Sequence, residues 1–242
     1  MQATETRQPH ATLELQSRKS KAQKIEQLLE LSNLRQPISM LEIGCGSGGI
    51  AHYFATHPSL KIQVTAIDTH DNRQIYDSYK YYSVKDAELP FNNDSFDVVI
   101  TNHVIEHVGQ RNAQIQHLKE IRRVLKPSGV GYLAVPNRWM VTEPHYRLKF
   151  LSWLPRYWRT PYLRLMRKGD FYDCEPLELN ELEKMLRTAK LNYRNICIEG
   201  LRTTFDLEKP NTLSSRILRL LPDNALSPLI PLIPTLIYRI QR

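Results

Sequence analysis

Residues 39–49 read Ser-Met-Leu-Glu-Ile-Gly-Cys-Gly-Ser-Gly-Gly, a short apolar run that passes directly into a glycine-rich loop. The apolar half predicts a buried strand, and the residues from Ile50 to Ala55 predict a helix beyond the loop. Glycines in such a loop allow a tight turn and the close approach of a ligand that a Cβ atom would hold away. The loop also satisfies the dinucleotide pattern G-x-G-x-x-G, so it indicates a nucleotide-like cofactor and leaves its identity open.

Predicted strands and helices alternate on both sides of this loop. Helical periodicity covers residues 17–34, about 115–125 and 177–191. Further strands are predicted by apolar runs at 62–67, 82–84, 96–101 and 130–135, and strands at 195–198 and 201–205 would complete the sheet. This alternation predicts an α/β fold, a Rossmann-like, doubly wound, mostly parallel sheet with helices on both faces.

Three acidic residues lie at the ends of successive predicted strands. Glu42 precedes the first glycine of the loop, where a dinucleotide enzyme normally has an apolar residue, and Asp68 ends the next strand. A carboxylate at that second position can accept hydrogen bonds from both ribose hydroxyls. Asp86 follows the third strand and can accept a hydrogen bond from an adenine amino group, with Ala87 against the ring. Three acids make a poor site for pyrophosphate and suit a cofactor that carries an ammonium and a sulfonium.

Six segments extend this pattern in a fixed order between residues 38 and 136. They are Leu41–Gly48, Ala66–Asp68, Asp86–Phe91, Ser95–Val99, Glu106–Val108 and Arg123–Gly129. In order and spacing the chain resembles the class I S-adenosylmethionine (SAM)-dependent methyltransferases, particularly the group that includes ubiquinone-biosynthesis O-methyltransferases. The resemblance implies a seven-stranded sheet with an antiparallel final strand, and SAM across the carboxyl ends of the first strands.

The same resemblance implies roles for individual residues. Glu42 would support the glycine loop and the amino end of the cofactor, Asp68 would hold the ribose, and Asp86 the adenine. Asn102 would lie beside the methionine portion. The cofactor-binding residues that we expect are Glu42, Gly44, Cys45, Gly46, Gly48, Asp68, Thr69, Asp86, Ala87 and Asn102.

Histidines near the expected site are the candidates for chemistry. His103, Glu106 and His107 follow the fourth strand at i, i+3 and i+4, so on a helix they would share one face and could hold a divalent metal. We favour the interpretation without a metal, in which Glu106 and His107 shape the mouth of the cofactor cleft. His145 follows the fifth strand, where it could serve as a general base or simply bind the backbone of its loop. His145 and His107 are candidates, and the sequence does not assign a catalytic residue.

Positive charge and apolar residues gather in the second half of the chain. The net charge is +8, and all three tryptophans lie within residues 137–170 among arginines and lysines. The segment 213–242 is rich in Leu, Ile, Pro and Arg, and its longest uncharged stretch falls short of the roughly 20 residues that a membrane span needs. Aromatic and basic side chains suit either nucleic acid or an anionic lipid surface. The aliphatic tail favours peripheral contact with a membrane through 137–170 and 213–242, or packing over the substrate opening, and makes nucleic acid a less favoured partner.

Composition and motifs together predict the domains and the setting. We expect a loose N-terminus at 1–16, a methyltransferase domain at 17–206 with a substrate lid at 137–175, and an apolar-basic tail at 207–242. The three cysteines are far apart and odd in number, and the N-terminus lacks the basic start and apolar run of a signal peptide. A reducing, cytoplasmic setting follows, with a peripheral position on the inner face of a membrane.

The predicted function is that of an enzyme, a SAM-dependent methyltransferase. Its acceptor is expected to be a small, lipophilic or membrane-associated molecule, methylated at oxygen. Three alternatives stay open: an RNA methyltransferase that uses the basic C-terminal half, a nicotinamide-dependent oxidoreductase, and a SAM-binding module without turnover. The sequence does not identify the acceptor or the oligomeric state.

Overall fold

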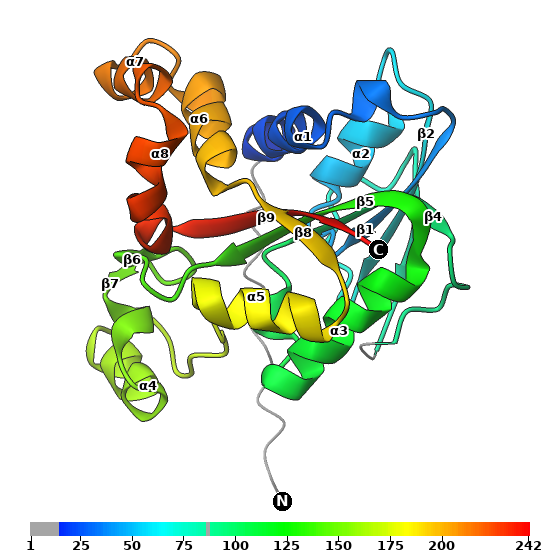
Figure 1. The fold of residues 1–242 in the computed structure, drawn as a ribbon. Helices are drawn as coiled ribbons and strands as arrows, with labels where there is room; N and C mark the ends of the chain where they lie inside the picture. The colour runs from blue at the N-terminus through cyan, green and yellow to red at the C-terminus, as the bar shows by residue number, and fades with distance from the viewer. Residues whose placement is uncertain (1–14, 86–87) are drawn as a thin grey trace, which may run out of the picture.

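A sheet of seven strands runs through the centre of the computed structural model, which describes residues 15–85 and 88–242 (Figure 1). The strand order is β3-β2-β1-β4-β5-β9-β8. The strands are β1 (Ile38–Ile43), β2 (Ile62–Asp68), β3 (Lys80–Ser83), β4 (Phe96–Asn102), β5 (Leu125–Pro136), β8 (Asn192–Asn195) and β9 (Thr235–Gln241). Strands β1 to β5 are parallel, and β9 is antiparallel to both of its neighbours. The predicted α/β fold with an antiparallel final strand is therefore confirmed.

Helices cover both faces of the sheet (Figure 1). On one face lie α1 (Leu15–Leu29), α2 (Gly49–Ala55) and α6 (Cys197–Glu208), and on the other α3 (Arg111–Val124) and α5 (Leu179–Thr188). Strand β1 is buried on both sides, because Leu41 and Ile43 pack toward α3 and α5, whereas Ile38 and Met40 pack toward α1 and α2. This alternation fixes the register of the strand and thus the place where the glycine loop leaves the sheet.

The C-terminal part of the sheet differs from the sequence-based prediction. The strands predicted at 195–198 and 201–205 are wrong: β8 ends at Asn195, and Cys197 begins α6. The seventh strand is instead β9, which comes from the segment predicted to be a tail and lies between β5 and β8. Because β9 is inside the sheet, both of its faces are covered, and Leu236, Ile237 and Tyr238 are all buried. A run that is apolar on both faces lacks the alternation of a half-exposed strand, which explains why its sequence suggested lipid contact.

Residues 137–175, the predicted lid, have a small apolar core of their own. They contain β6 (Thr142–Glu143), β7 (Leu148–Lys149), the 3₁₀ turn η3 (Leu151–Trp153) and α4 (Arg156–Leu165). The core consists of Tyr146, Leu148, Leu151, Leu163, Tyr172 and Cys174. At the base of the lid the side-chain amide of Asn137 donates hydrogen bonds to the backbone carbonyls of Pro231 and Ile233, at 2.7 and 2.8 Å. These bonds tie the lid to the segment that leads into β9.

The remaining elements form an arm beside α6. They are α7 (Leu213–Leu220), α8 (Asp223–Leu226) and the 3₁₀ helix η4 (Ser227–Leu232); two further 3₁₀ turns are η1 (Leu31–Asn33) and η2 (Ile105–His107). Within the described part of the chain, every helix is too short or too polar to cross a bilayer. The predicted loose N-terminus falls outside the described residues except for its last two positions, and Asp86 and Ala87 fall outside them as well.

Candidate active site

A cavity of about 840 Å³ opens at the carboxyl ends of β1, β2 and β4, under the lid. This volume is within the range of small-molecule sites in proteins. Five of the predicted cofactor-binding residues line the cavity, namely Gly44, Gly46, Asp68, Thr69 and Asn102. The lid contributes Met140, Thr142, His145 and Tyr146, and the segment before β9 contributes Pro234 and Thr235. The residues expected to hold a cofactor and the lid therefore share one space.

The glycine loop is held in a conformation that side chains would disturb. Gly44 and Gly46 both have positive φ angles, +73° and +52°, which favour glycine. A Cβ atom on Gly44 would lie 2.5 Å from Cγ2 of Val104, which is much too close. The backbone N–H of Gly46 donates a hydrogen bond of 2.9 Å to Asp68, and the N–H of Thr69 donates one of 2.7 Å to the same carboxylate. Asp68 thus connects the end of β2 with the loop after β1.

Glu42, Cys45 and Gly48 lie behind the cavity wall rather than on it. Glu42 is almost fully buried, and one of its oxygens has no hydrogen-bond partner. Burial raises the pKa of Glu42 to about 8, although the charge of Arg18 and a hydrogen bond with the backbone of Ala51 lower it. Gly48 turns the chain into α2 by donating its N–H to the carbonyl of Cys45. These residues shape the loop from beneath.

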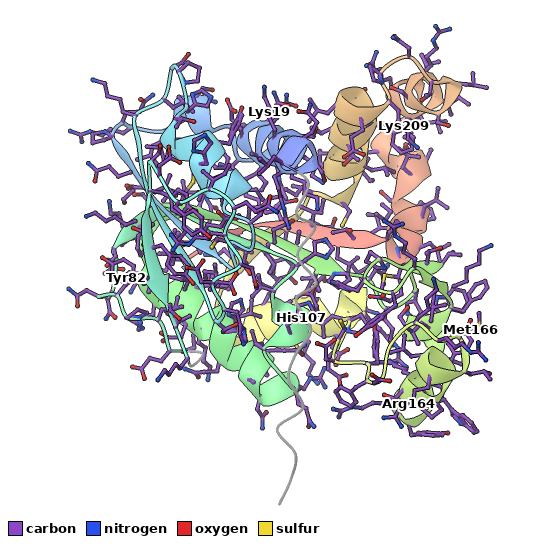
Figure 2. All side chains as sticks on the ribbon, turned by 180° about the vertical axis from the view of Figure 1, so that it is seen from behind. Lys19, Tyr82, His107, Arg164, Met166 and Lys209 are labelled. Carbon is purple, nitrogen blue, oxygen red and sulfur yellow. The ribbon has the colours of Figure 1, made fainter. Side chains whose placement is uncertain are left out.

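The segment after β4 is not the α-helix that its spacing suggested. His103 has a positive φ of 58°, and the turn that follows, η2, is a 3₁₀ helix of three residues. The expectation of one shared α-helical face is therefore wrong, but the side chains still meet: Oε1 of Glu106 lies 3.5 Å from Nδ1 of His103 and 3.9 Å from Nε2 of His107. Glu106 is fully buried, and neither of its oxygens has a hydrogen-bond partner. Figure 2 shows His107 near the centre of the molecule.

The other histidine candidate, His145, meets His107 from the lid. The two rings lie edge to face with their centroids 5.2 Å apart. Nδ1 of His145 is 2.6 Å from Oε1 of Glu143, a fully buried carboxylate whose other oxygen accepts the backbone N–H of Tyr146. Burial lowers the pKa of His145, but the hydrogen bond and charge of Glu143, with Glu106 and Asp173 nearby, raise it above its ordinary value.

Two groups of residues at the cavity have no clear signal in the sequence. Cys174 has its sulfur 3.8 Å from Nδ1 of His107 and 3.7 Å from Nδ1 of His145, and it comes from the far end of the lid. Helix α1 brings Arg18, Lys21 and Lys24 to the cofactor side of the cavity. Burial, together with the charges of Arg18 and Lys24, lowers the pKa of Lys21 to about 8. From sequence these cations read only as the polar side of an amphipathic helix.

Comparison with known proteins relates the part of the chain that contains the glycine loop to a protein family. Residues 41–133, from β1 into β5, match the family model described as "Methyltransferase domain". A probable S-adenosylmethionine-dependent methyltransferase of Mycobacterium tuberculosis is 35% identical over 104 residues, 41% of this chain and 36% of that protein. Residues 41–133 therefore carry a methyltransferase domain, similar to that of SAM-dependent enzymes.

Other similar proteins place this methyltransferase domain in a broad group. Cyclopropane-fatty-acyl-phospholipid synthase of Escherichia coli is 28% identical over 112 residues, 46% of this chain and 29% of that enzyme. The structure of Haemonchus contortus phosphoethanolamine N-methyltransferase 2 in complex with SAM has the same fold, with a TM-score of 0.52, 17% identity, and coverage of 90% of this chain and 51% of that one. The chain spans about a third of the length of the two curated relatives.

These findings support SAM as the cofactor and do not support the nicotinamide-dependent alternative. The narrower resemblance to ubiquinone-biosynthesis O-methyltransferases is not confirmed by the matches. The roles of the individual cofactor residues and of the histidines stay predictions. The structure places the histidines and five of the cofactor residues at the cavity, and Glu42, Cys45 and Gly48 away from its lining.

Proposed function

We propose that this protein is an enzyme that transfers the methyl group of SAM to an oxygen atom of a small, lipophilic, membrane-associated acceptor. The observation that carries the proposal is the single cavity in which the glycine loop and Asp68 face the histidines of the lid. Methyl transfer from a sulfonium is an in-line displacement, so the protein has mainly to align the acceptor with the methyl group and keep water out. One continuous cavity under a lid is suited to both tasks.

The cofactor half of the cavity has groups that match each part of SAM. The carboxylate of Asp68 would accept the ribose hydroxyls, as it already accepts three backbone N–H groups. Asn102, at the end of β4, would lie beside the methionine portion. Arg18 and Lys21, which come from α1, make one end of the cavity positively charged. This charge suits the carboxylate of the methionine portion of SAM.

The acceptor half combines apolar walls with groups that can accept a proton. Met140, Val108 and Tyr146 line it together with His107 and His145. A hydroxyl must lose its proton before or during methylation, whereas an amine with a free electron pair need not, so two adjacent imidazoles favour an oxygen acceptor. The name of the Escherichia coli relative refers to fatty-acyl phospholipids, which supports a lipophilic acceptor here.

Exposed apolar side chains support contact with a membrane. On α7, Leu213, Ile217 and Leu220 follow one another at i, i+4 and i+7, and Leu220 is 83% exposed. On α4, Trp158 and Leu165 are exposed in the same way. Both views show α4 and α7 along the same side of the molecule, with α8 between them in Figure 1 (Figures 1 and 2). Apolar and aromatic side chains beside arginines are typical of surfaces that bind anionic lipid.

The chemistry is tested by supplying the purified protein with SAM labelled at the methyl group and with lipophilic acceptors that carry a phenol, a catechol or an aliphatic hydroxyl. We expect label in an extracted product whose new bond is an O–CH₃ ether, and none with Asp68→Ala. Absence of SAM binding by the folded protein would contradict the proposal. Label incorporated into RNA, with strongly salt-sensitive RNA binding, would replace it with the RNA methyltransferase alternative.

Membrane contact is tested by sedimentation with vesicles of phosphatidylcholine and phosphatidylglycerol. We expect the wild type to sediment with the vesicles and the double variant Leu165→Glu, Leu220→Glu to stay in solution with unchanged SAM affinity. Tyr82→Glu is the matched control, since Tyr82 is also exposed but lies on the opposite side of the molecule from Met166, the residue that follows α4 (Figure 2). Equal sedimentation of all three proteins would exclude this surface. Truncation is unsuitable because it would remove β9 from the sheet.

A further inference from the structure

Three side chains with metal-binding atoms meet at the lid side of the cavity. His107 comes from the turn after β4, His145 from the lid after β6, and Cys174 from the end of the lid. Their ligand atoms all lie within 4.8 Å of one another. Residues so far apart in the sequence are brought together only by the folded lid. His107 and His145 line the cavity, whereas Cys174 is buried behind them.

The two sulfur-to-nitrogen distances in this cluster fit a tetrahedral metal ion. With Zn–S near 2.3 Å and Zn–N near 2.05 Å, tetrahedral geometry puts sulfur and nitrogen ligands about 3.6 Å apart. The sulfur of Cys174 lies 3.8 Å from Nδ1 of His107 and 3.7 Å from Nδ1 of His145. Both distances are therefore longer than the ideal tetrahedral value by about 0.2 Å or less, and a small change in side-chain rotation closes such a gap. Two imidazoles and a thiolate are the ligand types that zinc and related divalent ions prefer.

The surroundings of the cluster also favour a cation. His107 presents Nδ1 to Cys174 and Nε2 to the carboxylate of Glu106, 3.9 Å away. A metal-binding histidine commonly donates its second N–H to a carboxylate; Glu106 lies on that side of His107, beyond hydrogen-bond distance in this structure. Glu106 and Glu143 are both fully buried, and neither oxygen of Glu106 has a hydrogen-bond partner. Buried carboxylates are costly without a nearby positive charge, and a divalent ion at this cluster would supply it.

We infer that His107, His145 and Cys174 form a binding site for a divalent transition metal ion of the zinc type, with its fourth position open to the cavity. To bind the ion, Nδ1 of His145 gives up its contact with Oε1 of Glu143, 2.6 Å away, and that oxygen moves aside. Cys174 binds as the thiolate, and the displaced protons pass to solvent. This differs from the set His103, Glu106 and His107 considered from the sequence, because only His107 is common to both sets and Glu106 is not a ligand here. Binding of the ion does not depend on the proposed methyl transfer.

Where the proposed function also holds, the site gives the two histidines a definite part in it. They would be ligands rather than bases, and a hydroxyl group of the acceptor would reach the open position. Zinc lowers the pKa of a bound hydroxyl group, so the acceptor would lose its proton at neutral pH. The acceptor class is thereby narrowed to molecules whose methylated oxygen is free to approach a metal ion.

Cobalt(II) provides a test that does not use turnover. The purified, metal-stripped protein is titrated with Co²⁺ and its absorption recorded. We expect one equivalent to give a sulfur-to-cobalt charge-transfer band with intense visible bands of tetrahedral coordination, which one equivalent of Zn²⁺ abolishes. Cys174→Ser should lose the charge-transfer band, and His145→Gln should weaken binding at least tenfold. Cys197→Ser is the matched control, because Cys197 is equally buried but lies at the start of α6.

The outcomes separate this inference from the proposed function. SAM affinity, measured on every variant, shows that the cofactor half is folded, and methyl transfer is assayed separately. A wild type without the charge-transfer band, or a band that survives in Cys174→Ser, overturns the metal site even if methyl transfer is found. A band that requires Cys174 and tolerates Cys197→Ser supports the site even if no acceptor is methylated.

Discussion

Asp68 accepts a hydrogen bond of 2.9 Å from the backbone N–H of Gly46, so the end of β2 holds the glycine loop that leaves β1. The two strands are parallel neighbours, with Ile43 opposite Ile67, and the hydrogen bond continues their pairing beyond the sheet. The carboxylate that should bind the ribose therefore also helps to place the backbone that approaches the cofactor. Binding of the cofactor and the fixed conformation of the glycine loop should therefore both depend on the side chain of Asp68.

Asp68→Ala is expected to weaken SAM binding strongly. Hydrogen bonds to a charged group contribute about 1.5–3 kcal/mol, which corresponds to roughly a 10- to 150-fold loss of affinity. Asp68→Asn keeps one acceptor oxygen and should lose less. Calorimetric titration with SAM and with its demethylated product measures both. Asp77→Asn, at an exposed position, is the control; equal affinity in all four proteins would show that Asp68 does not contact the cofactor.

Gly44→Ala should destabilise the protein by a steric clash with Val104 that shortening the Val104 side chain would relieve. The new Cβ would meet Cγ2 of Val104 at 2.5 Å, and the φ of +73° adds strain for any residue with a side chain. Overpacking of this kind costs about 1–3 kcal/mol of the unfolding free energy. In the double variant Gly44→Ala, Val104→Ala the loss should be smaller than the sum of the single losses. Urea unfolding of the four proteins measures it; strict additivity would show that the clash is absent.

Glu42 should make the ligand-free protein less stable as the pH rises. Its pKa is about 8 in the folded protein, because of burial, against an ordinary value of 4.5. The unfolded chain thus loses this proton first, so the stability that Glu42 confers is complete below pH 4.5 and is lost progressively as the pH rises toward 8. At about 1.4 kcal/mol for each pKa unit, the difference amounts to roughly 5 kcal/mol at most.

Glu42→Gln removes this titration, so the variant should be the more stable protein at alkaline pH, while the two proteins should approach one another in acid. Unfolding by urea at about pH 5, 7 and 9 compares them. A constant difference between wild type and variant across this range would show that Glu42 does not change its proton affinity on folding.

Local patterns in the sequence predicted the cofactor half of the site. The strand, the glycine loop and Asp68 are close in sequence, and parallel strands end at the same edge of the sheet, so spacing alone places them together. The acceptor half depends on the lid. Cys174 reaches His107 only because the lid folds back on the domain, and no spacing in the sequence indicates that contact.

The sequence predicted a strand at 201–205 where the structure has helix α6, and this error has a specific physical reason. Thr203 and Thr204 are β-branched and favour a strand by propensity, but in α6 their hydroxyls donate hydrogen bonds to the carbonyls of Glu199 and Gly200, one turn back. Helix α6 also packs against α1, a contact between distant parts of the chain. Tertiary packing and these side-chain bonds outweigh the local preference.

Removal of residues 235–242 should abolish the folded state, because β9 is hydrogen-bonded to β5 on one side and to β8 on the other. The deletion takes away four buried side chains, those of Leu236, Ile237, Tyr238 and Ile240. Each contributes roughly 1.5–3 kcal/mol by burial, and their sum is comparable with the 5–15 kcal/mol that stabilises a whole domain. The truncated chain should show no cooperative thermal transition and no SAM binding. Leu229→Glu, on the exposed η4, should leave both intact. A truncated protein with the melting temperature and SAM affinity of the wild type would show that the last strand is dispensable and that the sheet is complete without it.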